Sequence, residues 1–223
     1  MSDEVKVFIV GIAGAVGSRL ARLLVLAGDQ VDGLYRRPEQ GERLAADNIH
    51  ATLGDLTRLD VPALADLLHG TDVVVFAAGA GGEGGAGATT AIDGAGLTTA
   101  IEAARLAGTR RLVLVSVFPE AWRGREVSAT FEHYIAVKKK AEAELAATDL
   151  DWVILRPAAL TDEPGTGRIS LASALIHTEI TRDDVAATLA GLVHTPGIRH
   201  KILELTEGST PITDAVREHT TTG

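Results

Sequence analysis

The chain has 223 residues, no cysteine and a formal net charge of −9 at neutral pH. This length suits one α/β domain, so we expect a single domain over residues 1–223. The lack of cysteine excludes disulfides, thiolate metal sites and a cysteine nucleophile. The acidic balance argues against binding to nucleic acid or to an anionic membrane surface.

The location and ligand class follow from what the sequence lacks. The first residues, MSDEVK, are acidic and lead straight into an apolar run, unlike a signal peptide. No stretch approaches the roughly 20 apolar residues of a membrane span. The histidines show no H-x-x-x-H or other metal-binding spacing. We therefore expect a cytoplasmic protein that acts on a small-molecule substrate and holds no metal.

Apolar runs of strand type alternate with amphipathic helical segments along the whole chain, which is the pattern of a parallel sheet covered on both faces. Asp60 is expected to cap one helix and Gly108 to end another. The predicted strands are residues 5–10, 30–35, 49–53, 72–78, 111–117, 152–156 and 201–205. The predicted helices are residues 15–27, 39–46, 61–68, 89–107, 128–147, 183–194 and 211–219.

Right-handed crossovers between these strands predict a Rossmann-type α/β fold, a doubly wound parallel sheet in the order 3-2-1-4-5-6-7 with helices on both faces. Ligands of such sheets bind at the carboxyl ends of the strands, near the switch point between the first and fourth strands. The glycine-rich stretch 79–87 (GAGGEGGAG) follows the fourth strand. It would line that crevice, or it is a flexible surface loop.

Three glycines, Gly11, Gly14 and Gly17, follow the first strand in GIAGAVG. Gly11 allows a sharp turn, Gly14 lets the backbone approach a pyrophosphate, and Gly17 lets the helix pack closely on the strand. Such a turn also directs backbone N–H groups and the positive end of the helix at one point, which suits a phosphate. We therefore predict a dinucleotide site here, with an ordinary tight turn as the alternative.

Several stretches resemble the atypical short-chain dehydrogenases, specifically the small NAD(P)-binding, epimerase/dehydratase-like proteins. They are GIAGAVG, YRRP, LGDLT, LVLVS, HYIAVKKKAEAEL, LDWVILRPAALTDEPGTG and ITRDDVAATLAGLV. Together they run over most of the chain, and they are specific for the family but not for a substrate. The resemblance implies an NAD(P)-dependent oxidoreductase with the fold predicted above.

The resemblance also implies how the cofactor lies. Asp55 would face the adenine amino group with the Leu56 backbone beside it, unless Asp55 is only a turn residue. Small residues at 77–79 would leave room for the adenine ribose, and residues 157–160 would lie against the nicotinamide. The predicted cofactor-binding residues are Gly11, Ala13, Gly14, Ala15, Val16, Gly17, Arg36, Arg37, Asp55, Leu56, Ala77, Ala78, Gly79, Lys138, Pro157, Ala158, Ala159 and Leu160.

Arg36 and Arg37 follow the second strand, where the NAD-specific pattern has an acidic residue for the ribose 2′-hydroxyl. A guanidinium group suits a 2′-phosphate, because its charge is permanent and its donors are forked. We therefore predict that NADP(H) is preferred over NAD(H). A solvated basic turn is the alternative.

Tyr134 and Lys138 form Y-x-x-x-K and would share one helix face. An ammonium beside a phenol stabilises the phenolate, which predicts a lowered pKa for Tyr134 and a role in proton transfer. Ser116, near the end of the fifth strand, is the third predicted catalytic residue, or a hydroxyl bonded to backbone. His133 is the fallback acid or base, and Asp93 is interpreted as a residue favoured by the helix dipole.

The sequence thus predicts hydride transfer between NADP(H) and a small or planar carbonyl or conjugated substrate. Residues 157–223 would contribute the substrate pocket; this segment is short, so a nucleotide-sugar epimerase or dehydratase is less favoured. One alternative is a flavin- or tetrapyrrole-type reductase, which needs little help from a tyrosine. The other is a regulatory protein that senses NADP(H) without turnover. The chain is expected to be a monomer or a homodimer.

Overall fold

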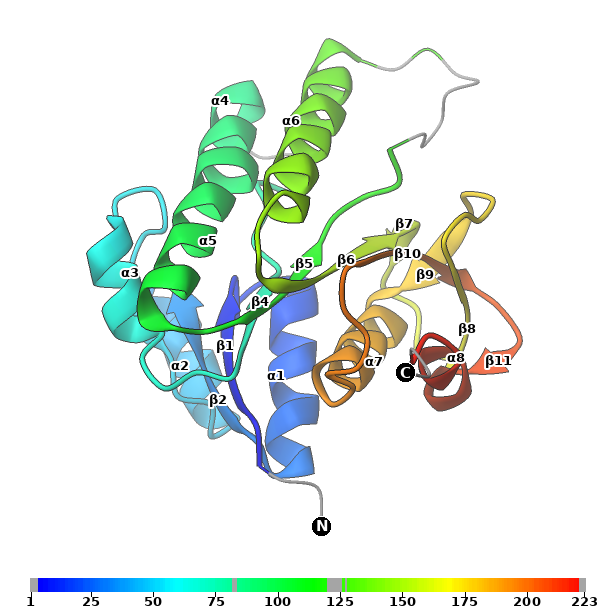
Figure 1. The fold of residues 1–223 in the computed structure, drawn as a ribbon, viewed down its shortest axis with the longest axis horizontal. Coiled ribbons are helices and arrows are strands. Elements are labelled where there is room, and N and C mark those ends of the chain that lie inside the picture. The colour runs from blue at the N-terminus through cyan, green and yellow to red at the C-terminus, as the bar shows by residue number, and fades with distance from the viewer. Residues whose placement is uncertain (1–3, 82–83, 120–125, 127, 221–223) are drawn as a thin grey trace.

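The computed structural model describes residues 4–81, 84–119, 126 and 128–220. Its centre is a nine-stranded sheet in the order β11-β8-β10-β6-β5-β4-β1-β2-β3 (Figure 1). The predicted strands correspond to β1 (Lys6–Val10), β2 (Gln30–Tyr35), β3 (Thr52–Leu53), β4 (Val73–Phe76), β5 (Arg111–Val115), β6 (Asp151–Pro157) and β10 (Lys201–Glu207). These strands are parallel and stand in the predicted order, which confirms the doubly wound Rossmann-type fold.

Helices cover both faces of the sheet (Figure 1). In β1, Val7 and Ile9 pack into the core of one face, whereas Phe8 and Val10 pack into the core of the other. Strands buried on both sides read as continuous apolar runs, which explains their sequences. The first face carries α1 (Ala15–Ala27), α2 (Pro38–Ala46), α7 (Arg182–Val193) and α8 (Ile212–Glu218), and the second carries α3 (Val61–Leu67), α5 (Gly96–Ala107) and α6 (Ala129–Ala146).

Both predicted helix caps are confirmed. The Asp60 carboxylate accepts the N–H of Ala63 at 2.9 Å at the start of α3. Gly108 ends α5 with a φ of +80°, the left-handed conformation in which a side chain would be strained. Local chemistry at these two positions therefore determines where the helices begin and end.

The helix predicted at 89–107 begins earlier and is not regular. It opens as α4 (Gly85–Thr89), passes through the π-helical turn η1 (Thr90–Ala95) and continues as α5. Part of the stretch 79–87 is therefore helical. A π-helical turn shifts the side chains relative to a regular helix, and such turns are frequent at functional sites.

Four short strands were not predicted. β8 (Arg168–Ala172) pairs antiparallel with β10 and with β11 (Thr210–Pro211), and β7 (Ala159–Thr161) pairs with β9 (Glu179–Thr181). β7, β9 and β11 have only two or three residues each, too few for an alternating pattern, so their pairing partners define them. β8 and β11 extend the sheet beyond β10, whereas β7 and β9 form a separate two-stranded sheet in the region that follows β6.

Side chains hold both ends of α7. The first residue of this helix, Arg182, lines the central cavity described below. The Thr181 hydroxyl accepts a hydrogen bond from the N–H of Asp184 at 3.0 Å, so Thr181 caps the helix. At the other end, the Arg111 guanidinium donates to the carbonyls of Leu192 and Ile198. Within the described part of the chain, no helix has the length and apolar character needed to cross a membrane.

Candidate functional site

Two adjoining cavities lie at the carboxyl ends of the parallel strands, where the topology predicts a ligand. The larger, about 760 Å³, is called the central cavity, and the smaller, about 190 Å³, the β2 pocket. Predicted site residues lining the central cavity are Ala13, Gly14, Ala15, Val16, Arg37, Ala77, Ala78, Gly79, Ser116, Tyr134, Lys138, Pro157 and Leu160. Those lining the β2 pocket are Gly11, Ala13, Gly14, Arg36, Asp55, Leu56, Ala77, Ala78 and Gly79.

Three predicted residues line neither cavity. Gly17 packs inside the turn, as described next. Ala158 is buried, and its N–H donates to Leu205 O, while the N–H of Ala159 donates to Thr178 O. These two residues fix the course of the chain between Pro157 and Leu160, which do reach the central cavity.

The glycine turn is tight because its backbone atoms approach one another closely. Gly11 has a φ of +93°, and a Cβ there would lie 2.7 Å from Ala78 N. A Cβ on Gly17 would lie 2.2 Å from the Gly11 carbonyl oxygen, so Gly17 packs against the turn itself rather than along the strand. The nearest neighbour of a Cβ on Gly14 is Gly11 O at 3.1 Å, and Gly14 borders both cavities.

The N-terminus of α1 opens into the central cavity. Its N-cap is Gly14, which has no side chain to cap the helix, and the first turn contains no acidic residue. The first backbone N–H groups of a helix have no partner within the helix, and those of Ala15 and Val16 lie at the cavity wall. Unpaired amides and a positive helix end fit the pyrophosphate of a dinucleotide.

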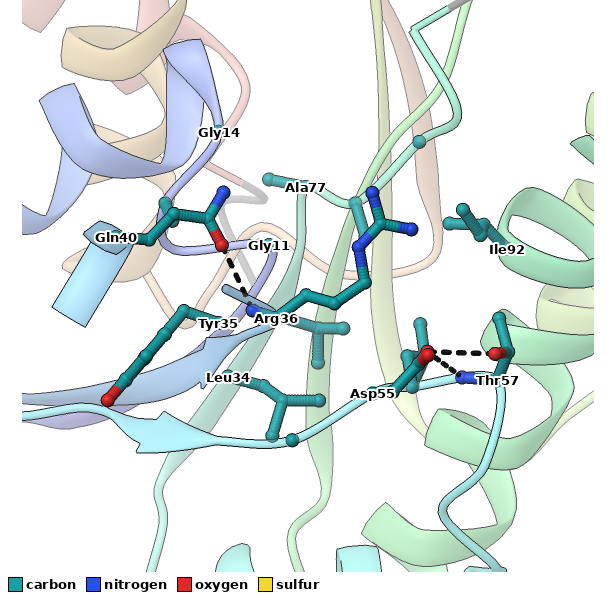
Figure 2. Close-up of a pocket in the computed structure, with 16 residues that line it drawn as sticks. Gly11, Gly14, Leu34, Tyr35, Arg36, Gln40, Asp55, Thr57, Ala77 and Ile92 are labelled. Carbon is teal, nitrogen blue, oxygen red and sulfur yellow. Dashed lines mark hydrogen bonds between the residues drawn. The ribbon is translucent and has the colours of Figure 1, made fainter. Parts of the chain in front are cut away.

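The two arginines after β2 diverge. Their backbone N–H groups both donate to Gln40 Oε1, at 3.1 Å and 2.9 Å, which fixes the turn before α2. Figure 2 shows the Arg36 side chain reaching over the β2 pocket, away from Gln40. Arg37 instead lines the central cavity, beside the residues that begin α1, and pairs with Glu39 at 3.4 Å. Cations therefore border both cavities.

Asp55 combines the two interpretations given above. Its Oδ1 accepts the Thr57 hydroxyl at 2.8 Å and the Thr57 N–H at 3.0 Å, so it stabilises a turn (Figure 2). These hydrogen bonds, aided by the charges of Arg36 and Arg58, lower the pKa of Asp55 below its ordinary value. Asp55 also lines the β2 pocket, where an ionised carboxylate can accept a hydrogen bond from an amino group.

Ser116 lies in the wall of the central cavity. Ser116 is only 5% exposed, and its backbone N–H donates to Leu155 O at 2.7 Å. Its Oγ is buried and has no hydrogen-bond partner among the described residues, so the interpretation as a hydroxyl bonded to backbone is wrong. A buried unpaired hydroxyl is costly, and a ligand in the cavity would satisfy it.

Tyr134 and Lys138 both line the central cavity, but the expected lowering of the tyrosine pKa is wrong. Burial raises the pKa of Tyr134, and the negative charge of Asp93 raises it further. The Lys138 ammonium lies 3.1 Å from Asp93 Oδ1 and donates to Val115 O at 3.1 Å. Because the charge of Lys138 is balanced by Asp93, it does not offset burial, and Tyr134 remains a neutral phenol.

Two charged residues that line the central cavity, Asp93 and Arg182, were not predicted as site residues. Asp93 is 1% exposed, and its Oδ2 accepts the N–H of Ala80 at 3.0 Å, so it is more than a residue favoured by the helix dipole. A signal was present, since Asp93 lies four residues before the buried Leu97 on the apolar side of its helix. Arg182 reaches the cavity from the start of α7 and pairs with Asp162.

Other predicted residues lie elsewhere or outside the described part of the chain. His133 points to Thr90, with 2.9 Å between Nε2 and Oγ1, and is absent from the lining of the central cavity. Residues 118–125 (FPEAWRGR), between β5 and α6, fall largely outside the described residues, apart from residues 118 and 119. Of the stretch 79–87, Gly79, Ala80, Gly81 and Gly85 line the central cavity.

Several known proteins are similar to this chain over nearly its whole length. A protein of Bacillus subtilis named as the uncharacterized sugar epimerase YhfK is 35% identical, over 96% of this chain and 99% of the relative. A structure named as an NAD-dependent epimerase/dehydratase from Bacillus halodurans is 31% identical, with a TM-score of 0.87, over 96% of this chain and 99% of that one.

Two further structures carry oxidoreductase names. The oxidoreductase ylbE from Lactococcus lactis is 29% identical, with a TM-score of 0.83, over 98% of this chain and 100% of that one. ChuY of Escherichia coli O157:H7, named an anaerobillin reductase, is 25% identical, with a TM-score of 0.75, over 90% of this chain and 96% of that one. A family described as NAD(P)H-binding matches residues 11–196. Since that match spans most of the chain and the glycine turn lies within it, this protein belongs to the NAD(P)H-binding family.

Proposed function

We propose that this protein is an NADPH-dependent reductase that transfers hydride to a small or planar carbonyl or conjugated acceptor. The observation that carries the proposal is the convergence of three features on one cavity. These are the uncapped N-terminus of α1, the buried unpaired hydroxyl of Ser116 and the phenol of Tyr134. The first suits a dinucleotide, and the other two suit an acceptor oxygen.

The chain offers groups for each part of the cofactor. The amides at the start of α1 would hold the pyrophosphate, and Arg36 and Arg37 the 2′-phosphate. Lys138 uses one of its three N–H donors on Val115 O, which leaves a donor for a ribose hydroxyl. When bound, the reduced nicotinamide supplies the hydride, that is, both electrons of the reduction.

Ser116 and Tyr134 would act on the acceptor. As hydride reaches the acceptor carbon, the π electrons of the C=O bond move to oxygen, where both hydroxyls can donate hydrogen bonds. Tyr134 transfers its proton to that oxygen and regains one from solvent. A neutral phenol is the form that can donate, which agrees with the raised pKa of Tyr134.

A fluorescence titration of the purified protein with NADPH and with NADH tests the cofactor part. We expect tight NADPH binding and weak NADH binding. A panel of aldehydes, ketones, enones, flavins and tetrapyrroles then tests turnover by NADPH consumption. If neither nucleotide binds, the proposal is wrong; if NADPH binds but no acceptor consumes it, a sensing role takes its place.

Replacing Arg36 and Arg37 by alanine should weaken NADPH binding about 100-fold while changing NADH binding less than about threefold. The estimate takes about 3 kcal/mol for charge-assisted hydrogen bonds to a 2′-phosphate, which NADH lacks. The measurement is the same pair of titrations. The double variant Arg105→Ala, Arg199→Ala is the matched control. It removes two exposed, ion-paired arginines near the amino ends of β5 and β6, and neither residue lines the central cavity or the β2 pocket. Equal losses for both nucleotides would refute the preference for NADPH.

A flavin- or tetrapyrrole-type reductase, which needs little help from Tyr134, is the second candidate, favoured by the volume of the central cavity, about 760 Å³. The similarity to ChuY, which is named as a reductase, points the same way. The two candidates differ in their need for Tyr134, as argued in the Discussion. A sugar epimerase, suggested by the name of the B. subtilis relative, would regenerate its cofactor and show no net NADPH consumption.

A further inference from the structure

Asp93 and Lys138 form a buried ion pair at the wall of the central cavity. The two side chains are 1% and 5% exposed, and 3.1 Å separates Nζ from Oδ1. Asp93 comes from the π-helical turn η1 and Lys138 from α6, and these two elements pack together. Two opposite charges buried together form a unit of no net charge, which interacts weakly with a third group compared with either charge alone.

The balance of charge between Asp93 and Lys138 matters for Tyr134, which lies near both. Tyr134 lies one helical turn before Lys138 on α6, and both line the cavity. Among the residues that the structure describes, the other charged side chains lining the cavity are Arg37, from the turn before α2, and Arg182, from the start of α7. Each of these arginines has its own acidic partner. The neighbouring His133 is bonded to Thr90.

We propose that Asp93 is a positioning residue that neutralises Lys138 and so keeps Tyr134 in its protonated form, which sets the site to donate a proton to a reduced acceptor rather than to withdraw one from an alcohol. This inference rests on the proposed function for its direction of reaction. Its electrostatic part stands without it, because that part concerns only Asp93, Lys138 and Tyr134.

Asp93 also ties the pair to the chain that follows β4. Its Oδ2 accepts the N–H of Ala80 at 3.0 Å, and a Cβ on Gly79 would lie 3.0 Å from Oδ1. The carboxylate thus sits between the backbone after β4 and the Lys138 ammonium. An asparagine at this position retains an oxygen for the Ala80 N–H and loses only the charge, which makes Asp93→Asn the appropriate variant.

Removal of the Asp93 charge should favour the tyrosinate. A carboxylate raises the free energy of a nearby phenolate, and an unbalanced ammonium lowers it, so the pKa of Tyr134 should fall in Asp93→Asn. The chain contains two tyrosines, Tyr35 and Tyr134. In a Tyr35→Phe background, tyrosinate absorbance therefore reports Tyr134 alone, in the protein without cofactor or acceptor.

The test is an ultraviolet pH titration of four proteins in that background, with circular dichroism defining the range in which each stays folded. The unaltered site should form tyrosinate above the ordinary value of about 10. Asp93→Asn should form it about 1 pH unit lower or more. Asp93→Asn with Lys138→Met, which removes both charges, should return close to the starting value. Glu142→Gln, which removes a buried charge on the same helix and so disrupts the ion pair of Glu142 with Arg156 of β6, should leave the titration unchanged.

Two results would overturn the proposal. One is an Asp93→Asn titration that coincides with that of the starting protein, and the other is a shift in Glu142→Gln equal to the shift in Asp93→Asn. If Asp93→Asn does not fold, the double variant decides, and a titration 1 pH unit or more below the starting value contradicts it. Because no nucleotide is present, a failure of NADPH binding leaves this result intact. With a working acceptor, the acidic shift should also appear in the pH profile of turnover, which a purely structural role would not move.

Discussion

Replacing Gly14 by valine is expected to abolish binding of NADPH and NADH while the protein still folds. The Cβ of a residue at this position has one close neighbour, Gly11 O at 3.1 Å, so the fold needs only a small adjustment. The branched side chain would instead occupy the space above the first amides of α1, where the pyrophosphate would lie. Loss of two charge-assisted hydrogen bonds, about 3 kcal/mol, corresponds to at least about 100-fold weaker binding.

Nucleotide fluorescence titration together with thermal unfolding measures both halves of this prediction. Gly197→Val is the matched control, because a Cβ there meets Thr220 Cγ2 at 3.4 Å and lies beyond α7, at the other edge of the sheet. The control should bind both nucleotides normally. Normal binding by Gly14→Val would mean that the glycine turn serves only the fold.

Tyr134→Phe is expected to lower kcat by about 10²- to 10⁴-fold, the usual contribution of a general acid, with little change in NADPH binding. Phenylalanine retains the buried ring and its packing near Phe131, whose ring centroid is 6.2 Å away. It removes only the hydroxyl that would donate the proton. Steady-state NADPH consumption with an acceptor identified in the panel provides the rates.

His133→Gln is the control for this variant. It changes the neighbouring titratable residue, which is bonded to Thr90 and is absent from the lining of the central cavity. Its turnover should stay within about threefold of the original, the size of a surface effect of at most about 0.6 kcal/mol. A Tyr134→Phe protein that keeps its full kcat would contradict the role of Tyr134 and favour the flavin- or tetrapyrrole-type reductase.

Much of the fold follows from local chemistry that one sequence contains. Phe8 and Ile9 are both buried, on opposite faces of the sheet. The sequence of β1 is therefore apolar throughout, which predicts a strand between two helix layers. Gly11, Asp60 and Gly108 each act through a bond or dihedral within a few residues of their own position. Turns and caps of this kind are readable because they do not depend on distant parts of the chain.

The predicted site residues were also readable in part, since parallel strands deliver their carboxyl ends to one edge. Ser116 and Tyr134 therefore reach the same cavity even though the elements between them were only roughly bounded. What the sequence by itself determined is the α/β order, the glycine turn and the edge of the sheet where the site lies. These depend on hydrophobic periodicity and on the crossover rule.

The tertiary structure alone decided the charges inside that site. Asp93 reaches Lys138 because a π-helical turn and α6 pack together. Burial of Tyr134, together with the negative charge of Asp93, raises the pKa of this tyrosine, whereas Y-x-x-x-K predicts a lowered one. Likewise, Arg36 and Arg37 are adjacent in sequence yet serve different cavities. The physical reason is that burial and ion pairing depend on groups brought together from distant segments, and no local pattern records which charge will face which.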